Sequence, residues 1–262
     1  MSRENAADIL CIGAQRAMTS WLHQALTAHP GTAAFPDFGP VTSTSKEAHY
    51  WDWNHKRGPD WYRVLMRPLD DSRQSLDFTP EYAFLNDPQI AECHALNPGA
   101  KVIYILRDPL ARAVSAIRMH TVWATKHAPA DKAPLTYDQT FLNRCRNARL
   151  WDHGAYAANL QRWRRHYPDL LVLNFEDLRA DPLAGLQQVL AHCGLDWAGL
   201  DAPTRTTLTE RAARHVWATP AYPLDADCVH FLHGALWPQR AALKAETGFE
   251  FTEGAAILEA AG

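Results

Sequence analysis

One group of residues near the start of the chain has the types and the spacing that bind phosphate or sulfate groups. Arg16, Thr19 and Ser20 follow a short apolar run at 9–12 and Gly13. The run is typical of a buried parallel strand, the glycine permits a tight turn, and Thr19 and Ser20 are predicted to act as N-caps of the helix that follows. A strand, a turn and a helix start place free backbone amides and the positive end of the helix dipole together. The pattern therefore predicts an anion site lined by Arg16.

A second group follows the clearest strand of the sequence. Residues 102–106 are apolar and mostly β-branched or aromatic, and Arg107 comes directly after them. Ser115 lies eight residues further on, about two turns up a helix that begins at Pro109. Arg107 and Ser115 are therefore expected to hold a second anion, because an arginine supplies planar, permanently charged donors. The alternative is a local ion pair between Arg107 and Asp108, with Ser115 playing no part.

The first loop lacks the lysine of the common nucleotide-binding loop. Met18 and Thr19 stand where the GxxxxGK[ST] pattern has glycine and lysine. This departure disfavours a Mg-nucleotide-dependent small-molecule kinase and favours another phosphate-bearing ligand. The kinase stays an alternative, as does a non-catalytic nucleotide-binding protein. An ordinary strand–helix unit with no ligand is a further alternative for this segment alone.

The composition of the chain argues against several classes of function. The chain has 262 residues and a formal net charge of -3, which argues against a nucleic-acid partner. No long apolar stretch precedes the first strand, so neither a signal peptide nor a transmembrane segment is expected. Five scattered cysteines suggest reduced, mostly buried thiols and a cytoplasmic location.

The order of elements predicts an α/β fold. Candidate strands at 9–12, 32–35, 75–78, 102–106 and 170–173 alternate with helical patterns, which is typical of a mainly parallel sheet between two helical layers. Helices are predicted at 60–66, 183–193, 229–237 and 239–246, whereas 121–136 and 201–223 are interpreted as loop or irregular. We expect a single three-layer α/β/α domain over residues 1–262, with the ligand site beyond the carboxyl ends of the strands.

Three ordered motifs together resemble a known family. Residues 13–22, 46–52 and 107–115 are similar to the sulfotransferases that use 3′-phosphoadenosine 5′-phosphosulfate (PAPS). The likeness is greatest to the heparan-sulfate and related bacterial carbohydrate branch, and it runs from Ile9 to about Leu195. It includes the segments 78–82, 154–156 and 174–182. The resemblance implies a P-loop-like phosphosulfate-binding loop and transfer of a sulfuryl group to a hydroxyl or amine.

The resemblance also implies how the donor is held. The residues matching its 5′-phosphosulfate loop are Arg16, Ala17, Met18, Thr19, Ser20 and Trp21. Arg107 and Ser115 match the positions that hold the 3′-phosphate of PAPS and of its product, 3′-phosphoadenosine 5′-phosphate (PAP). Arg214 is a further candidate for that phosphate, in a basic and aromatic segment from 211 to 222 that is interpreted as a loop that orders on ligand binding. The alternative for this segment is a surface loop with no role. The family needs no metal, and none is expected here.

On the acceptor side the resemblance implies that Glu47 is the general base. His49 and Asp52 match supporting polar positions, and Arg16, His49 or Lys46 would meet the negative charge that grows on the leaving oxygen. One position departs from the pattern, because Phe78 stands where the heparan-sulfate relatives carry a catalytic lysine. Lys46 is the candidate replacement, and the alternative is that Lys46 is a solvent-exposed lysine without a role. The acceptor is expected to be a small molecule, a carbohydrate or a lipid.

Overall fold

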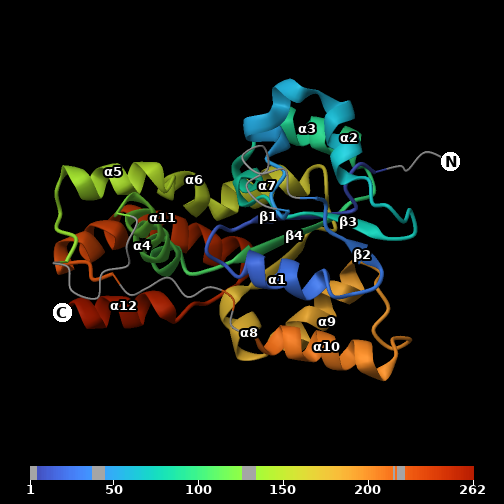
Figure 1. The fold of residues 1–262 in the computed structure, drawn as a ribbon. Coiled ribbons are helices and arrows are strands. Elements are labelled where there is room, and N and C mark those ends of the chain that lie inside the picture. The colour runs from blue at the N-terminus through green and yellow to red at the C-terminus, as the bar shows by residue number, and fades with distance from the viewer. Residues whose placement is uncertain (1–4, 37–44, 126–133, 215, 217–221) are drawn as a thin grey trace. The chain divides into compact units, whose positions relative to one another are not determined.

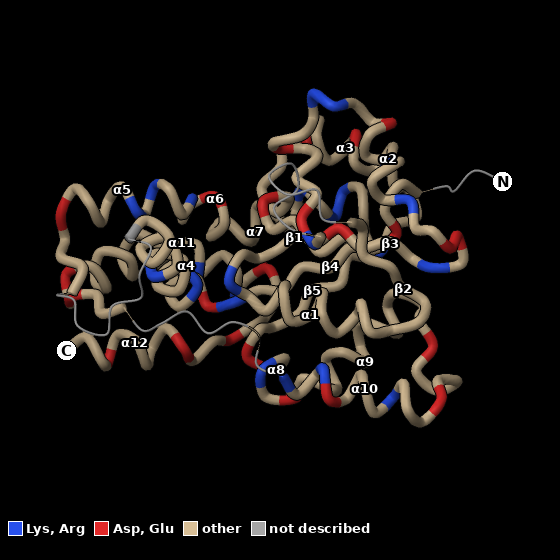
Figure 2. Tube along the Cα trace, viewed as in Figure 1, with Lys and Arg blue, Asp and Glu red and all other residues tan. Residues whose placement is uncertain are grey.

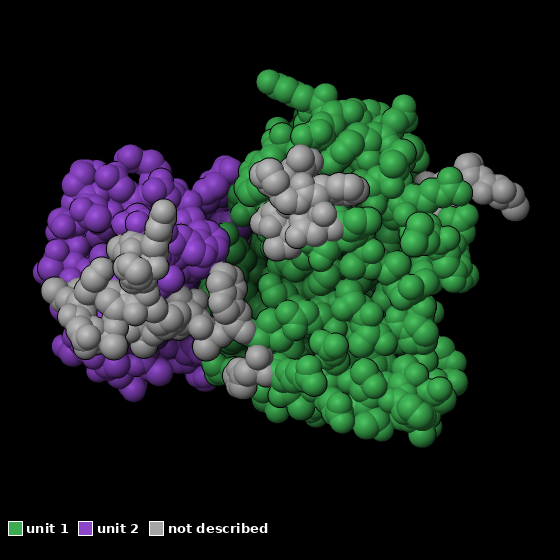
Figure 3. All heavy atoms as spheres, in the orientation of Figure 1, with its two compact units in different colours: residues 1–106, 159–216 green, residues 107–158, 217–262 purple. Residues whose placement is uncertain are grey.

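A computed structural model describes residues 5–36, 45–125, 134–214, 216 and 222–262. Its contacts divide the chain into two compact units (Figure 3). Unit 1 consists of residues 1–106 and 159–216, and unit 2 of residues 107–158 and 217–262. The prediction of one domain over the whole chain stays a prediction.

Unit 1 contains a parallel sheet of five strands. They are β1 (Ile9–Gly13), β2 (Thr32–Ala33), β3 (Gln74–Asp77), β4 (Lys101–Leu106) and β5 (Leu171–Asn174). The strand order is β2-β3-β1-β4-β5, and every pair is parallel. β1 at the centre is buried along its whole length, as its apolar sequence predicts for a strand covered on both faces. The predicted α/β class with a parallel sheet is confirmed.

Helices cover both faces of this sheet (Figure 1). On one side lie α1 (Thr19–Leu26), α8 (Phe175–Ala180), α9 (Pro182–His192) and α10 (Ala202–Ala213). On the other side lie α2 (Pro59–Met66) and α3 (Asp87–Leu96). The sequence around these two helices also contains the short helices η2 (Tyr50–Asn54), η3 (His55–Arg57) and η4 (Pro80–Phe84). Helix α7 (Tyr156–Arg164) crosses the division between the units. The arrangement is the predicted three-layer one.

Unit 2 is helical in its described residues. It contains α4 (Pro109–Thr125), α5 (Gln139–Asn147), α6 (Leu150–Gly154), α11 (Ala226–Thr247) and α12 (Glu253–Ala261). These helices enclose one apolar core made of Leu110, Ala113, Val114, Ala116, Ile117, Phe141, Cys145, Ala148, Leu150, Cys228, Leu232 and Leu236. Burial of this many apolar side chains supplies a driving force for the unit to fold compactly.

Several sequence-based boundaries were wrong. The segment 201–223 contains helix α10, and the two helices predicted at 229–237 and 239–246 form the single helix α11, which continues through Pro238. Asp201 and Asp225 begin these two helices by accepting hydrogen bonds from backbone amides three residues on. Helix α4 extends into the predicted loop as far as Thr125, and residues 126–133 lie outside the described part.

The surface carries both signs of charge. Basic and acidic residues are interspersed along the described chain (Figure 2), consistent with a net charge of -3. All five cysteines are buried free thiols. Among the described helices, none combines the length and the apolar character that crossing a bilayer requires.

Candidate active site

The loop after β1 is built for close backbone packing. Gly13 has φ 145°, and a β-carbon there would lie 3.2 Å from both the Pro80 carbonyl oxygen and the Tyr104 ring. Arg16 and Met18 adopt left-handed backbone conformations, with φ of 71° and 64°. The loop therefore bends twice within a few residues before α1 begins.

The cap of α1 differs from the prediction. Thr19 and Ser20 are the first two residues of the helix, and Met18 occupies the N-cap position without a side-chain hydrogen bond. The left-handed turn at Met18 starts the helix one residue earlier than a Thr19 cap would. It leaves the two hydroxyl groups directed at a neighbouring cation instead of at the backbone.

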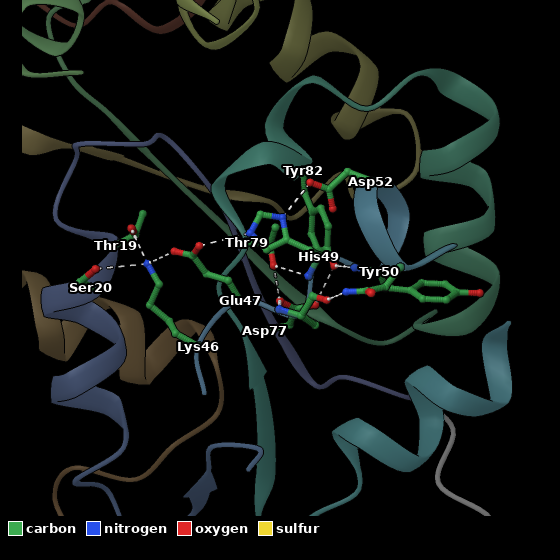
Figure 4. A network of polar contacts seen from close by, with 12 residues as sticks. Thr19, Ser20, Lys46, Glu47, His49, Tyr50, Asp52, Asp77, Thr79 and Tyr82 are labelled. Atoms are coloured by element: carbon green, nitrogen blue, oxygen red, sulfur yellow. Dashed lines mark hydrogen bonds and ion pairs between the residues drawn. The ribbon is translucent and has the colours of Figure 1, made fainter. Parts of the chain in front are cut away.

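That cation is Lys46, which joins the loop to the acidic side of the site (Figure 4). Its Nζ lies 3.4 Å from Thr19 Oγ1 and 3.2 Å from Ser20 Oγ. The same Nζ lies 2.5 Å from Glu47 Oε1, in an ion pair whose side chains are only 11% and 18% exposed. One ammonium group therefore contacts the helix start and the candidate base together.

Glu47 continues into a chain of charged groups. His49 Nε2 lies 3.3 Å from Glu47 Oε2, and His49 Nδ1 lies 2.7 Å from Asp52 Oδ2. Burial alone would lower the pKa of His49, but its hydrogen bonds to Asp52 and Glu47 outweigh burial and raise that pKa to about 10. Burial would raise the pKa of Glu47, but attraction to Lys46 and hydrogen bonds from His49 and Lys46 lower it to about 2. Near neutral pH the linked side chains are therefore a cationic lysine, an anionic glutamate, a cationic histidine and Asp52.

The backbone of 46–50 is fixed by the segment that follows β3. The amide of Phe78 donates to the Lys46 carbonyl at 2.8 Å. The amides of Ala48, His49 and Tyr50 donate in turn to side-chain oxygens of residues 77–82, namely Asp77 Oδ1, Thr79 Oγ1 and the Tyr82 hydroxyl. Successive backbone groups of the candidate site are thus attached to one short stretch of chain.

Asp77 is the centre of this attachment. It is fully buried and also accepts hydrogen bonds from the hydroxyls of Tyr62, Thr79 and Tyr82 at 2.9, 2.7 and 3.1 Å. Burial raises its pKa to about 6 even though these hydrogen bonds favour the charged form. A carboxylate at the end of β3 therefore positions Glu47 and His49 through the backbone of the residues beside them.

His49 itself has a strained backbone. Its φ is 49°, and it directly precedes the π-helical turn η2. The backbone amides of Trp53 and Asn54 both donate to its carbonyl oxygen, and the Trp53 ring stacks on the imidazole with 3.5 Å between ring centroids. Irregular turns of this kind are frequent at functional sites, because they aim a side chain where a regular helix would not.

A third carboxylate adjoins this chain. One carboxylate oxygen of Glu81, one of Glu47 and a ring nitrogen of His49 all lie within 4.8 Å of one another. Such a set has the donor types that can hold a metal ion. Burial, together with the neighbouring charges of Glu47 and Asp52, raises the pKa of Glu81 to about 7, and the charge of His49 opposes this shift.

The second predicted anion site belongs to unit 2. Arg107 donates to both carboxylate oxygens of Glu253 on α12, at 2.8 and 3.2 Å, and so pairs with Glu253 in addition to any local partner. Asp108 is fully buried, accepts from the Ala111 amide at 3.0 Å and lies 3.5 Å from Arg240 Nε. Ser115 is half-buried on α4.

The structure brings together most of the predicted residues of unit 1. Thr19, Ser20, Lys46, Glu47 and His49 form one connected network with Asp52 (Figure 4). Ala17 and Trp21 are buried beside it in the chain, and Arg16 and Met18 are half-buried. Arg214 is exposed at the end of α10, two residues after Ala212, whose carbonyl accepts from the Trp21 indole at 2.9 Å. Residues 215 and 217–221 of the predicted closing segment lie outside the described part.

Four residues of the site were missed as functional. Asp77, Thr79, Glu81 and Tyr82 surround the Glu47–His49 segment, whereas the motifs had indicated roles only for Lys46, Glu47, His49 and Asp52 in this region. The signal was a carboxylate at the carboxyl end of a buried strand, followed two to five residues later by Thr-Pro-Glu-Tyr. Phe78 is buried and packs edge-on against His23, with 5.3 Å between ring centroids.

Comparison with known proteins gives consistent matches. The family model described as a sulfotransferase domain matches residues 6–212. Human heparan sulfate glucosamine 3-O-sulfotransferase 3B1 is 30% identical over 195 residues, covering 71% of this chain and 45% of that protein. Human bifunctional heparan sulfate N-deacetylase/N-sulfotransferase 2 is 30% identical over 217 residues, covering 74% of this chain and 23% of that protein. The chain thus spans about half the length, or less, of these relatives.

Solved structures show the same fold. A sulfotransferase from Alicyclobacillus acidocaldarius superposes with a TM-score of 0.68 at 20% identity, covering 97% of this chain and 100% of that one. The sulfotransferase domain of the Synechococcus PCC 7002 olefin synthase superposes with a TM-score of 0.51 at 16% identity, covering 90% and 97%. At these identities the likeness concerns the fold.

Proposed function

Because this chain belongs to the PAPS-dependent sulfotransferase family, as its motifs indicated, we propose that it transfers a sulfuryl group from PAPS to a hydroxyl or amine of an acceptor. The observation that carries this proposal is the connected network from the Thr19 and Ser20 hydroxyls through Lys46 to Glu47 and His49. It joins a helix start suited to an anion with a carboxylate suited to take a proton.

The donor is held by its anionic groups. Arg16, the hydroxyls of Thr19 and Ser20 and the amides from Ala17 to Trp21 would bind the 5′-phosphosulfate, because Met18 contributes no cap that competes for the first amides of α1. Arg107 and Ser115 would bind the 3′-phosphate, with Arg214 as a further candidate. That Arg107 pairs bidentately with a carboxylate supports its suitability, since phosphate presents the same geometry of oxygens.

Glu47 is the proposed general base. Its carboxylate is ionised near neutral pH and can take the acceptor proton, a role worth roughly 10²–10⁴ in rate. While Lys46 contacts it, Glu47 is a weak base, because the ammonium stabilises its charged form. When the ammonium is drawn toward the sulfuryl group or the leaving phosphate oxygen, the proton affinity of Glu47 rises. Lys46 would then stabilise the leaving group and would also determine when Glu47 becomes basic enough to take the proton.

Lys46 is also the proposed substitute for the lysine that relatives carry at the position of Phe78. The Phe78 ring is buried against His23, which burial keeps neutral by lowering its pKa to about 3. Neither ring offers a positive charge to a developing oxyanion. Lys46 Nζ lies within 3.4 Å of both loop hydroxyls and does offer such a charge.

The acceptor class is proposed from the relatives. Those named above act on heparan sulfate by their printed names, which favours a carbohydrate over a small molecule or lipid. Trp53, with 61% of its surface exposed beside His49, offers an apolar face of the kind that sugars pack against. A cytoplasmic location stays a proposal that rests on the five free cysteines.

The test compares two nucleotides. PAP at about 100-fold above its dissociation constant should stabilise the fold by about 2.7 kcal/mol, measured as a rise in melting temperature, whereas ATP with Mg²⁺ should not. Glu47→Gln should keep this stabilisation and lose at least about two orders of magnitude in sulfuryl transfer. Stabilisation by ATP with Mg²⁺ and none by PAP would instead assign the chain to the kinase class.

A further inference from the structure

Glu81 is a carboxylate in the site that the proposed mechanism does not yet use. It lies in the first turn of η4, and its Oε2 is shielded from solvent without a hydrogen-bond partner among the described residues. A buried carboxylate oxygen in this state carries a free-energy cost that a bound ligand can remove.

The other charged groups of the site already contact one another. Lys46 contacts Glu47, and His49 contacts both Glu47 and Asp52. These four groups have two charges of each sign, so the ionised Glu81 adds one net negative charge to the cluster. A ligand group that binds Glu81 is therefore expected to bring positive charge, or hydrogen atoms to donate.

The distance between the carboxylates restricts what that group is. One oxygen of Glu81 and one of Glu47 lie within 4.8 Å. N–H···O hydrogen bonds are about 2.7–3.2 Å long, so a single nitrogen atom can reach both oxygens. A protonated amine has three hydrogens to donate, whereas a hydroxyl has one and can satisfy only one carboxylate at a time.

Proton stoichiometry leads to the same group. Sulfation of a hydroxyl releases one proton, and Glu47 alone can accept it. Sulfation of an alkylammonium releases two, because the nitrogen must lose one proton to free its lone pair and another once the sulfur–nitrogen bond has formed. A site with two adjacent carboxylates has the number of bases that the second reaction needs.

We infer that Glu47 and Glu81 together bind a primary amine, and that the acceptor of this chain is sulfated on nitrogen. This inference rests on the proposed function. The ammonium gives its first proton to Glu81, and the freed lone pair attacks the sulfur of PAPS. The sulfur–nitrogen bond forms while the bond from sulfur to the phosphate oxygen breaks, and its electron pair leaves with PAP. Glu47 takes the second proton, so that R–NH₃⁺ and PAPS yield R–NH–SO₃⁻, PAP and two protons.

The electrostatics of Glu81 suit the first step. Its pKa of about 7, raised by burial and by Glu47 and Asp52 against the opposing charge of His49, allows it to accept a proton and to release it again near neutral pH. A divalent cation is the rival occupant. It would have to displace the proton that His49 shares with Glu47 and lie beside the Lys46 ammonium, so the charges already present disfavour it.

The experiment offers matched acceptors to the full chain with labelled PAPS. The pairs are an oligosaccharide with free glucosamine amines against its N-acetylated form, and benzylamine against benzyl alcohol. We expect kcat/KM for the amine of a pair to exceed that of its partner by at least about 10-fold, with the sulfate on nitrogen by mass spectrometry and NMR. Preferred sulfation of the hydroxyl compounds would overturn the inference.

Two variants test whether sulfation of the amine depends on Glu81. Glu81→Gln preserves the shape but accepts no proton, so amine turnover should fall by about 10²–10⁴ while PAP affinity stays within about two-fold. Wild-type turnover should rise with pH through about 7 as Glu81 ionises, and the variant should lose this limb. The control is Glu92→Gln, because Glu92 pairs with exposed His55 outside the site, and it should change neither quantity.

The remaining outcomes separate this inference from the proposed function. Unchanged amine turnover in Glu81→Gln would remove Glu81 from the reaction and overturn the inference. Zinc binding by calorimetry that is lost in Glu81→Gln would assign the cluster to a cation and also overturn it. If PAP binds but no amine is sulfated, only the inference fails, whereas absence of PAP binding would reject the proposed function itself.

Discussion

Lys46 has two anionic neighbours in the proposed reaction, the Glu47 carboxylate and the sulfuryl group of the donor, and its single positive charge is shared between them. In the structure it contacts Glu47 at 2.5 Å and the loop hydroxyls at 3.2 and 3.4 Å. A sulfuryl group bound at the loop would compete with Glu47 for the same charge. Donor binding and the strength of the base are therefore linked, because an ammonium drawn to the donor no longer stabilises the carboxylate.

This linkage predicts the outcome of a double-mutant cycle. Glu47→Gln should tighten PAPS binding by about 3- to 10-fold, because Lys46 no longer divides its attraction between two anions. In a Lys46→Met background the same substitution should have little effect on PAPS affinity. Isothermal titration calorimetry without acceptor measures both.

The comparison with PAP and with a nearby carboxylate supplies the controls. PAP lacks the sulfuryl group, so Glu47→Gln should affect its binding less than that of PAPS. Glu81→Gln removes a negative charge without a Lys46 contact and reports the general electrostatic effect. An equal gain in affinity from Glu47→Gln with and without Lys46 would rule out the linkage.

At the scale of elements, the site depends on how the short segment 46–50 is attached to the end of β3. Asp77 accepts one backbone amide and three hydroxyl groups and is fully buried. Removing one acceptor therefore leaves several buried donors without partners, each of which costs about 1–3 kcal/mol.

Asp77→Ala should lower the free energy of unfolding by about 3 kcal/mol, measured by urea denaturation. It should also abolish transfer, because Glu47 and His49 lose the backbone that positions them. Asp71→Ala is the matched control, since Asp71 forms an exposed pair with Arg67 and should cost no more than about 0.5 kcal/mol. Full activity in Asp77→Ala would show that the segment is positioned by other contacts.

The elements that the sequence predicted well are those with a strong local pattern. The apolar runs that became β1 and β4 are fully or almost fully buried, and their register beside each other brings the loop after β1 next to the end of β4. The contacts of the proposed base followed from motifs, because Glu47, His49 and Asp52 are close in sequence. Both kinds of signal lie within a few residues, where spacing determines geometry.

The elements that were missed depend on distant contacts. Helix α10 has few apolar residues, but Trp21 of α1 donates to its Ala212 carbonyl, and its Leu208 and Ala212 are buried. Helix α11 continues through Pro238 because packing of its apolar side outweighs the lost hydrogen bond. The environment of Glu81 also could not be predicted, because its neighbours Glu47 and His49 come from another segment.

At the scale of the whole molecule, some of the residues proposed to bind the donor lie in unit 2. Arg107 belongs to unit 2, where Glu253 of α12 accepts from it through both carboxylate oxygens. A 3′-phosphate that binds Arg107 must share or replace this carboxylate. The C-terminal helix is thus expected to influence nucleotide affinity although the family match ends at residue 212.

Two substitutions test this expectation. Arg107→Ala should weaken PAP binding by at least about 10-fold, and Glu253→Gln should strengthen it, because the guanidinium is then held less tightly by its present partner. Glu250→Gln is the control, since Glu250 pairs with exposed Lys244 on the same part of the chain. Calorimetry that finds PAP affinity unchanged in Arg107→Ala would exclude Arg107 from the nucleotide site.

The stacking of Trp53 on His49 provides an optical signal from within the site. The indole lies parallel to the imidazole within 3°, with 3.5 Å between centroids, while 61% of the Trp53 surface stays exposed. A charged imidazolium in such contact quenches indole fluorescence, so emission from this tryptophan should brighten when a ligand displaces either ring. The difference spectrum between wild type and Trp53→Phe would isolate that emission from the other tryptophans, and stopped-flow recording would then follow acceptor arrival in real time without any label.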